Sequence, residues 1–289
     1  MKLIALDMDG TTLNSHKELS IENIEAIKKA QQQGHIVMIL SGRPFILIHE
    51  QLTKHCLDCP IGGNNGTELY TEGKLLELTS LTSEQSHQIA RAIEDERMPY
   101  KMGTNKGTFV HKDWFKRFEQ VLASGRVPAE YDKHKDYKMF TASPTVYGQG
   151  FFQQFADIVH GDYTVQKFLI LALDPQQKQR LQIKLQSIEG IFVTSSSPFN
   201  LEITHINGNK GNGLKRMASH FRIPLENTIA IGDERNDLPM FRAAGLSIAM
   251  GNADEEVKKH SDLVTLTNDE NGVAYAIEHY ILKESYKST

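Results

Sequence analysis

The chain has 289 residues, of which 39% are hydrophobic and 24% are charged, and its formal net charge is -4. This is the composition of an ordinary globular protein, and the weak negative charge excludes a basic field for binding nucleic acid. The sequence contains no run of about 18 apolar residues, so it predicts no membrane-spanning helix and no membrane partner. The length exceeds what one hydrophobic core usually serves, which favours two domains.

The first ten residues, MKLIALDMDG, combine one lysine with a short apolar stretch that leads directly into two aspartates. No small-residue cleavage site follows, so the segment is predicted to be a strand rather than a signal peptide. The chain has only two cysteines. This usage is typical of a reducing compartment, and we expect a cytoplasmic location.

The two cysteines, Cys56 and Cys59, form an isolated CxxC motif. A redox-active pair is one interpretation, because thioredoxin-like motifs have this spacing. A structural zinc site would need two further ligands, and the sequence has no second cysteine pair. We favour a third interpretation, in which two small side chains lie in a loop before a strand near Pro60 and Ile61.

The N-terminal segment is predicted to form a strand, a helix and a second strand. Continuous apolar runs at residues 3–6 and 36–40 indicate two buried strands. Between them, Ser20 can cap a helix whose apolar positions fall at spacings of three and four, and Gly34 ends it. This order predicts a right-handed βαβ unit with a parallel sheet.

The C-terminal third repeats this pattern. Its predicted elements are a helix at 210–221, a strand at 228–231, a helix at 236–244, a strand at 246–250 and a helix at 272–282. Both ends of the chain are therefore predicted to form one α/β domain with a doubly wound parallel sheet, made of residues 1–82 and 206–289.

The middle of the chain, residues 83–205, does not follow this pattern. It alternates predicted helices at 83–97 and 176–187 with strand-like runs at 168–173, 190–194 and 201–203. The last two runs are consistent with a hairpin. We expect an inserted α+β domain here.

Acidic residues follow two of the predicted strands. The sequence DMDGT at residues 7–11 follows the first strand, and GDERND at residues 232–237 follows the strand at 228–231. A calcium-binding EF-hand loop is an alternative for the first motif, since Glu18 lies near the required place, but a strand stands where the flanking helix should be. Converging carboxylates repel one another unless a cation neutralises them. Oxygen ligands without histidine or cysteine favour a hard cation, and Mg²⁺ suits a site completed by phosphate and water.

Four short motifs occur in order: Asp7-x-Asp9-Gly-Thr, Ser41-Gly42-Arg43, Lys210-Gly211 and the GDERND motif. This order resembles the haloacid dehalogenase superfamily across essentially the whole chain. The long insertion and the sequence GNNG at residues 63–66 resemble its Cof-type branch, which has a Rossmann-like core and a large inserted α+β (C2B-type) cap. The resemblance implies a Mg²⁺-dependent phosphatase of small metabolites, with the cap setting substrate specificity. Departures are slight, with Thr12 where Leu is commoner and Ser41 where Thr often stands.

The resemblance also implies the role of each reacting group. Asp7 would attack phosphorus and form an aspartyl phosphate, and Asp9 would protonate the leaving oxygen and then deprotonate water. The metal would be held by Asp7, the backbone carbonyl of Asp9 and Asp233. Lys210 would supply a fixed positive charge beside the nucleophile.

The remaining motif residues are implied to bind phosphate or to support the site. Ser41 and the backbone N–H of Gly42 would donate hydrogen bonds to phosphoryl oxygens. Arg43 would either order the second motif or reach the substrate. Asn236 would contact phosphate or the metal shell, and Asp237 would orient Lys210 or a metal-bound water.

The sequence leaves several functions open. A sugar phosphate is the leading substrate, and a phosphorylated flavin precursor or pyridoxal phosphate are alternatives. A phosphomutase would share the nucleophile and Asp9, and a binding protein without turnover would retain only the fold. The expected partner is a small phosphorylated molecule, and we expect a monomer or a weak homodimer.

Overall fold

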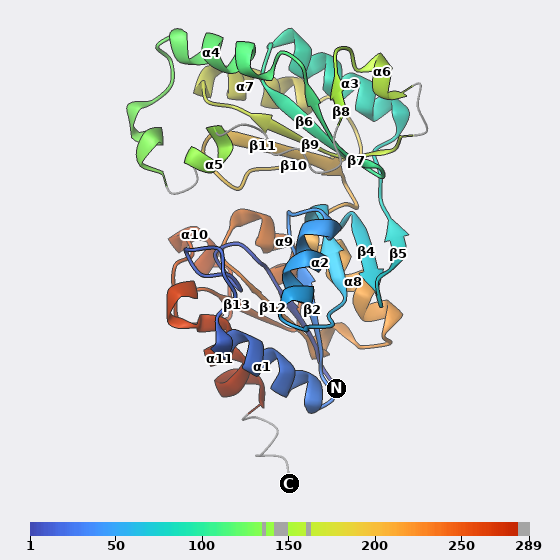
Figure 1. The fold of residues 1–289 in the computed structure, drawn as a ribbon, viewed down its shortest axis with the longest axis vertical. Helices are drawn as coiled ribbons and strands as arrows, with labels where there is room; N and C mark the ends of the chain where they lie inside the picture. Colours follow the sequence, from blue (N-terminus) through green and yellow to red (C-terminus); the bar gives the residue numbers. More distant parts are fainter. Residues whose placement is uncertain (135–136, 142–149, 160–162, 283–289) are drawn as a thin grey trace. The chain divides into compact units, whose positions relative to one another are not determined.

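The computed structural model describes residues 1–134, 137–141, 150–159 and 163–282. It divides the chain into two compact units, one made of residues 1–78 and 208–289 and the other of residues 79–207. Figure 1 shows both units and labels many of their elements. The sequence analysis assigned residues 1–82 and 206–289 to one domain and residues 83–205 to the other.

The first unit contains an eight-stranded sheet in the order β14-β13-β12-β1-β2-β3-β4-β5. The strands from β14 to β3 are parallel, and β4 and β5 extend the sheet as antiparallel strands. Their bounds are β1 Leu3–Leu6, β2 Ile36–Leu40, β3 Ile61–Gly63, β4 Glu68–Thr71, β5 Lys74–Leu78, β12 Thr228–Gly232, β13 Leu246–Ala249 and β14 Leu263–Val264. The predicted doubly wound parallel sheet is confirmed, while the β4–β5 hairpin was not predicted.

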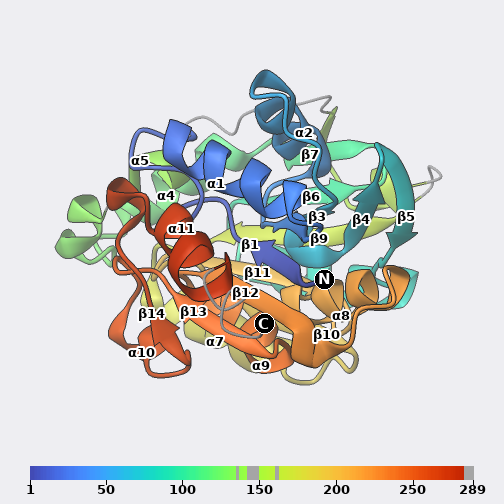
Figure 2. The ribbon, with the colours of Figure 1, turned by 90° about the horizontal axis from the view of Figure 1, so that it is seen from below.

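Helices cover both faces of this sheet (Figure 2). They are α1 Ile21–Gln32, α2 Phe45–Lys54, α8 Lys210–His220, α9 Leu238–Ala243, α10 Glu255–Lys258 and α11 Gly272–Ala276. Short 3-10 turns lie at Asn64–Gly66, Leu225–Asn227, Arg235–Asp237 and Asn268–Glu270. The helix predicted at 236–244 therefore begins as a 3-10 turn, and the helix predicted at 272–282 continues after α11 as a π-helix, Ile277–Leu282.

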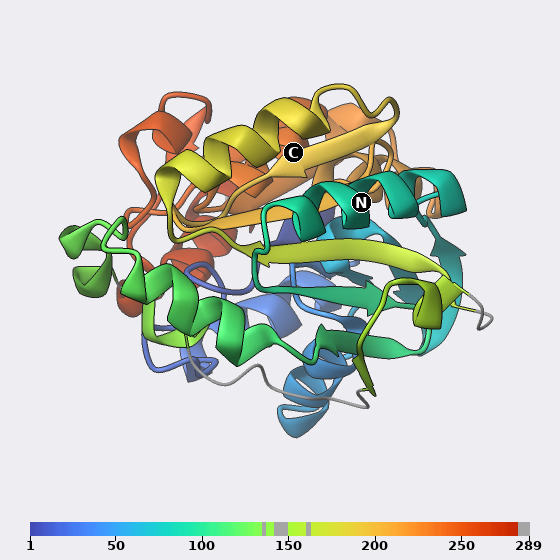
Figure 3. The same cartoon turned by 90° about the horizontal axis from the view of Figure 1, so that it is seen from above.

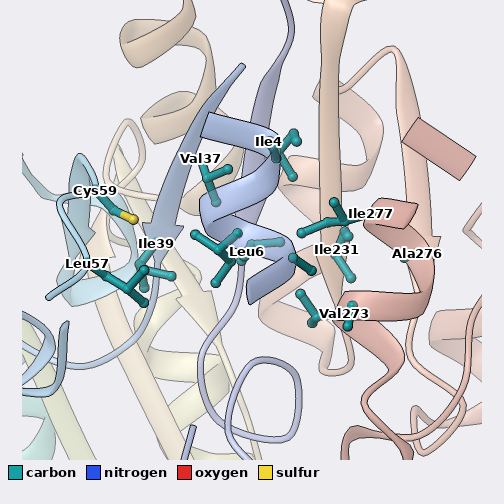
Figure 4. Packing of buried hydrophobic residues seen from close by; sticks show 14 of the residues in the cluster. Ile4, Leu6, Val37, Ile39, Leu57, Cys59, Ile231, Val273, Ala276 and Ile277 are labelled. Carbon is teal, nitrogen blue, oxygen red and sulfur yellow. The ribbon is translucent and has the colours of Figure 1, made fainter. Parts of the chain in front are cut away.

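Side chains of β1 alternate between two hydrophobic clusters. Ile4 and Leu6 pack in the cluster that includes residues of α1, α2 and α11, part of which is drawn in Figure 4. Leu3 and Ala5 pack in the cluster that includes residues of α8, α9 and α10. Because successive side chains of a strand point to opposite faces, an apolar run of this kind is buried on both sides. This burial fixes β1 in the centre of the unit.

The second unit contains a six-stranded sheet in the order β10-β11-β9-β6-β7-β8. The strands are β6 Tyr100–Thr104, β7 Gly107–His111, β8 Gly150–Phe152, β9 Val165–Leu171, β10 Ile191–Thr194 and β11 Asn200–His205. The predicted hairpin is confirmed, because β10 and β11 pair antiparallel. The β6–β7 hairpin was not predicted.

Two long helices of this unit, α3 Ser83–Asp95 and α7 Pro175–Leu185, pack on one face of the sheet through a shared hydrophobic cluster (Figure 3). The helix α4 Trp114–Ala123 contributes to a separate cluster with Leu171 and Phe199. Shorter elements are the 3-10 turn Ala129–Lys133 and the helices α5 Tyr137–Thr141 and α6 Ala156–Val159.

The start of α7 is held by Asp174. Its carboxylate accepts hydrogen bonds from the backbone N–H groups of Gln176 and Gln177, and Arg126 donates another at 2.5 Å. Burial raises the pKa of Asp174, but the hydrogen bonds of Arg126 and the two amides outweigh it and hold this pKa below its usual range. The ionised cap therefore stabilises the fold above the unfolded pKa of about 3.9, and its contribution is lost as the pH falls through the folded pKa.

We expect Asp174→Ala to lower the free energy of unfolding by about 1 to 2 kcal/mol at pH 7, because the cap hydrogen bonds are lost. Denaturant unfolding at pH 7 and again near pH 3 measures this loss, which should shrink at the lower pH. Asp113→Ala is the matched control, since Asp113 holds the same position on α4 without a side-chain cap bond. An equal loss in both variants would contradict the capping role.

The sequence predicted no membrane-spanning helix. Within the described ranges, no helix has both the length and the apolar character needed to cross a membrane.

Cys56 and Cys59 are free, and they lie in the segment between α2 and β3. Burial, with a smaller effect of Asp58, raises the pKa of the Cys59 thiol to about 12. Such a thiol is a poor nucleophile at neutral pH, which favours the structural interpretation of the CxxC motif.

Candidate functional site

The polar motifs lie at one edge of the first unit's sheet. Asp7 follows β1, Ser41 follows β2 and Asp233 follows β12, and these three parallel strands are neighbours. The N–H of Asp7 still donates to the carbonyl of Ile231 at 2.9 Å, so the nucleophile candidate is anchored to the sheet. The carboxyl edge of a parallel sheet is where ligands bind in such folds.

Three buried carboxylates gather at this edge. Asp7, Asp233 and Asp237 each offer one oxygen, and these oxygens all lie within 4.8 Å of one another. The sequence had assigned the metal to Asp7, Asp233 and the backbone carbonyl of Asp9, with Asp237 in a supporting place. The structure brings Asp237 into the carboxylate cluster, whereas the Asp9 carboxylate has other partners.

Lys210 lies between two of these carboxylates. Its Nζ is 2.5 Å from Oδ1 of Asp7 and 2.5 Å from Oδ1 of Asp237, and the lysine is buried at the start of α8. The other oxygen of Asp237 accepts the N–H groups of Asp233 and Glu234, both at 2.9 Å. Asp237 is therefore held by the backbone and in turn holds Lys210.

Burial and the neighbouring charges shift the pKa values of Lys210 and Asp7. Burial lowers the pKa of Lys210, but Asp237 and Asp7 outweigh it and the pKa is raised, so the ammonium stays charged. Burial raises the pKa of Asp7 to about 7, with Lys210 opposing and Asp237 adding to the rise. A cation bound among the carboxylates would stabilise the ionised form of Asp7.

The carboxylate of Asp9 pairs with two cations, Arg43 and Lys17. Arg43 donates from Nε and Nη2 to its two carboxylate oxygens, each at 2.7 Å, and Nζ of Lys17 lies 2.9 Å from Oδ1. Burial raises the pKa of Asp9, but the hydrogen bonds and charges of Arg43 and Lys17 outweigh it and lower the pKa to about 2. Asp9 is therefore ionised at neutral pH. The sequence had left Arg43 either to order the second motif or to reach the substrate, and the structure pairs it instead with Asp9 of the first motif.

The GNNG segment links the second and fourth motifs. Asn65 donates its N–H to the carbonyl of Ser41 and Asn64 donates to the carbonyl of Arg43, each at 2.8 Å. The φ of Asn64 is 47° and that of Asn65 is 62°. Asparagine tolerates this positive φ better than most residues do. The side-chain amide of Asn236 donates to Oδ1 of Asn65 at 3.2 Å. Ser41 is buried, and its Oγ accepts the N–H of Arg43 at 3.2 Å.

The donor set of the site fits a small hard dication. Carboxylates of Asp7, Asp233 and Asp237 supply anionic oxygens. Oδ1 of Asn236 is buried and has no hydrogen-bond partner within the described part of the chain, so a further oxygen is available there. Such all-oxygen surroundings favour Mg²⁺ over softer metals.

A family model described as haloacid dehalogenase-like hydrolase matches residues 4–277. The chain belongs to the haloacid dehalogenase-like hydrolases. The resemblance that the four motifs indicated is therefore confirmed.

Relatives of this hydrolase match it over nearly its whole length. The Bacillus subtilis phosphatase YwpJ is 31% identical over 97% of this chain and 100% of its own. The B. subtilis 5-amino-6-(5-phospho-D-ribitylamino)uracil phosphatase YwtE is 31% identical over 97% of this chain and 98% of its own. A solved structure of a haloacid dehalogenase-like hydrolase from B. subtilis has a TM-score of 0.84 and 29% identity, covering 97% of this chain and all of that one.

The structure also adds residues of this hydrolase that the sequence analysis missed. Asn252 donates to the carbonyl of Gly10 at 2.8 Å and lies 3.5 Å from Oδ2 of Asp233, while Thr11 donates to Oδ1 of Asp233 at 2.8 Å. Asn252 comes just after β13, the parallel strand next to β12, and that position was the signal that could have found it. Lys17 carried no comparable signal.

Gly10 gives a sharp test of the site in this hydrolase. Its φ is +78°, and a Cβ added there would lie 2.3 Å from Oδ2 of Asp233. We expect Gly10→Ala to lower kcat/KM for phosphate release by about 100-fold or more, because Asp233 must move. Gly34→Ala is the matched control, since Gly34 has a φ of +80° with nothing within 4 Å. Wild-type kinetics in Gly10→Ala, or an equal loss in Gly34→Ala, would contradict the role of the close approach to Asp233.

Proposed function

We propose that this hydrolase removes phosphate from small phosphomonoesters, sugar phosphates first, with Asp7 as the nucleophile and Mg²⁺ as the cofactor. The observation that carries the proposal is the contact of Lys210 with both Asp7 and Asp237 at 2.5 Å, beside Asp233. A buried carboxylate next to a fixed cation suits attack on a phosphoryl group, because positioning and charge do most of the work in phosphoryl transfer.

The reaction would proceed in two displacements. Oδ of Asp7 forms a bond to phosphorus, the bond from phosphorus to the substrate oxygen breaks, and that oxygen leaves with a proton. Water then attacks the aspartyl phosphate, loses a proton and releases inorganic phosphate with a free Asp7. Lys210 offsets negative charge near Asp7 in both steps, while Ser41 and the N–H of Gly42 are proposed to bind phosphoryl oxygens.

The metal would be held by Asp7, Asp233 and Asp237, with the carbonyl of Asp9 as the further ligand that the sequence predicted and Asn236 nearby. When bound, Mg²⁺ supplies positive charge that reduces repulsion between the carboxylates and the phosphate.

Asp9 is proposed to donate the proton that the leaving oxygen takes up and to accept the proton that the attacking water loses. In the arrangement with Arg43 and Lys17 it is an ionised carboxylate, which is the form that takes a proton from water in the second step. To protonate the leaving oxygen in the first step, Asp9 must first take up a proton, and a carboxylate paired with two cations resists this. The acid step therefore requires Asp9 to leave these partners.

The substrate class is proposed as small phosphorylated metabolites, with sugar phosphates first. A flavin precursor is the alternative supported by the relative that acts on 5-amino-6-(5-phospho-D-ribitylamino)uracil, and pyridoxal phosphate is another. The second unit, residues 79–207, is proposed as the cap that sets specificity. We place the activity in the cytoplasm, in a monomer or weak homodimer.

A chelator tests the proposed function. Phosphate release from a metabolite panel should fall to background in excess EDTA and return when Mg²⁺ is added, and millimolar Ca²⁺ should inhibit because it accepts looser geometry. Full activity in the chelator would contradict the metal assignment. A mutase would convert a sugar phosphate to an isomer and release little phosphate, so product analysis separates the two reactions.

A further inference from the structure

A surface cavity of the second unit is lined mainly by charged side chains. It lies among the C-terminal end of α3, the middle of α4 and the first turns of α7, and its volume is about 300 Å³. None of its lining residues belongs to the four motifs. The charged ones are four arginines and two carboxylates: Arg97, Arg117, Arg126, Arg180, Asp95 and Glu96.

Arg117 is already engaged within the protein. Its guanidinium donates to both oxygens of Glu94, at 3.3 and 2.5 Å, and to the carbonyl of Met98 at 3.1 Å. The side chain of Arg117 is buried. Arg117 therefore forms part of the cavity wall and has little left to offer a ligand.

Arg126 and Arg180 are each held through one nitrogen only. Nε of Arg126 donates to Asp174 at 2.5 Å, and Nε of Arg180 donates to Glu96 at 2.9 Å. Both accepting carboxylates are buried. Among the described residues, the terminal Nη groups of the two arginines have no hydrogen-bond partner. These guanidinium groups are thus held in place, with N–H groups available to a ligand.

Arg97 adds a cation whose guanidinium has no hydrogen bond or ion pair among the described residues. Its φ is 52°, directly after the C-cap of α3, where glycine or asparagine is usual because most side chains are strained there. A cation at a helix C-terminus is favourable by itself. Arg222 has the same place after α8, with a φ of 55°, and lies in the first unit, outside this cavity. Arg222 is therefore the reference against which a role of Arg97 in the cavity can be tested.

The carboxylates at the cavity leave the charge of Arg97 unbalanced. Glu96 is shared by Arg180 and by Lys184, whose Nζ lies 2.9 Å from Oε1 of Glu96. The same Nζ lies 3.6 Å from the carboxylate of Asp95. The two carboxylates beside the cavity pair with the other two arginines. An anion bound beside Arg97 would therefore meet cations that outnumber the carboxylates.

Gln177 adds a hydrogen-bond acceptor to the cavity wall. Its Nε2 donates to the carbonyl of Glu96 at 3.1 Å. Its Oε1 is buried and has no hydrogen-bond partner in the part of the chain that the structure describes. Leaving a buried acceptor unpaired is unfavourable, so a ligand that carries an O–H group suits this position.

We propose that Arg97, Arg126 and Arg180 form a binding site for a phosphate group. Guanidinium groups donate to the oxygens of phosphate in pairs, and three separate guanidinium groups suit a tetrahedral anion better than a carboxylate with two oxygens. Two sources supply such a group: free inorganic phosphate, or an organic phosphate whose hydroxyl donates to Gln177. The site does not rest on the proposed function, because no residue of the candidate active site takes part in it.

Calorimetric titration of the full chain with inorganic phosphate tests the site. Excess EDTA is present, and NaCl keeps the ionic strength constant. Arg97→Gly should weaken phosphate binding by about tenfold, the usual loss for a hydrogen bond to a charged group. Arg97→Lys keeps the charge and should recover part of the affinity.

Arg222→Gly is the matched control, and it should bind phosphate as the wild type does. Both glycine variants remove an arginine of positive φ at the end of a helix, where glycine is well tolerated, so both should fold. The candidate active site is the same in all of these proteins, so phosphate bound there does not affect the comparison.

Two phosphonates distinguish the sources, because a bond from carbon to phosphorus is not hydrolysed as an ester is. Ethylphosphonate lacks the hydroxyl that 2-hydroxyethylphosphonate carries. Tighter binding of the hydroxylated compound, with the difference lost in Gln177→Leu, assigns the site to an organic phosphate. Equal binding of the two compounds, with both weakened in Arg97→Gly, assigns it to free phosphate.

The proposal is overturned if Arg97→Gly binds phosphate with the affinity and stoichiometry of the wild type, or if Arg222→Gly loses as much affinity. The proposed function is judged separately, by whether the wild-type chain with Mg²⁺ hydrolyses an aryl phosphate. A chain that fails to hydrolyse aryl phosphate but binds phosphate through Arg97 would lose only the proposed function.

Discussion

Asp7→Asn is expected to lower the rate of phosphate release by about 10⁴-fold or more, the scale of loss seen when a covalent nucleophile is removed. The amide is nearly the same size as the carboxylate, but it is neutral and cannot form an acyl phosphate under these conditions. Lys210 would keep its contact with Asp237, so the cluster should retain its shape. Initial rates on an aryl phosphate with Mg²⁺ measure the effect.

The control for this variant is Asp58→Asn, which removes one exposed carboxylate from the same unit. Its rate should match the wild type, and thermal unfolding of both variants checks that they are folded. Turnover by Asp7→Asn at the wild-type rate would contradict both the assignment of Asp7 as the nucleophile and the two-step reaction.

Asp9→Ala should lower the rate by a factor that depends on the leaving group of the substrate. An alkyl oxygen leaves with difficulty unless it is protonated, so the rate on a sugar phosphate should fall by about 10² to 10⁴-fold, the range for loss of a general acid or base. An aryl oxygen needs little protonation, so its first step should be affected much less. The variant also frees Arg43 and Lys17 of their shared partner.

Single-turnover measurements isolate the first step, in which the leaving group departs, from the hydrolysis of the aspartyl phosphate. Rates of leaving-group release from the sugar phosphate and the aryl phosphate are compared in Asp9→Ala and in the wild type. Equal losses on the two substrates would count against the acid role. Loss confined to the second step would leave Asp9 as a base alone.

Much of the first unit could be predicted because the determining patterns are local. The apolar runs of β1, β2 and β12 are continuous since both faces of these strands are buried. Ser20 caps α1 as predicted, accepting the N–H of Asn23. The β4–β5 hairpin escaped prediction because β5 reads as Lys-Leu-Leu-Glu-Leu and is largely exposed, so it lacks the burial pattern that marks a strand.

The sequence by itself determined the family and the strand ends at which Asp7, Ser41 and Asp233 would lie, because motif order and apolar periodicity are properties of the chain alone. Only the tertiary structure decided which side chains meet there. Asp237 joins the carboxylates, and Asp9 turns to Arg43 and Lys17. These partners are chosen by side-chain direction and by competition for hydrogen bonds between segments far apart in the chain, and no local pattern encodes that choice.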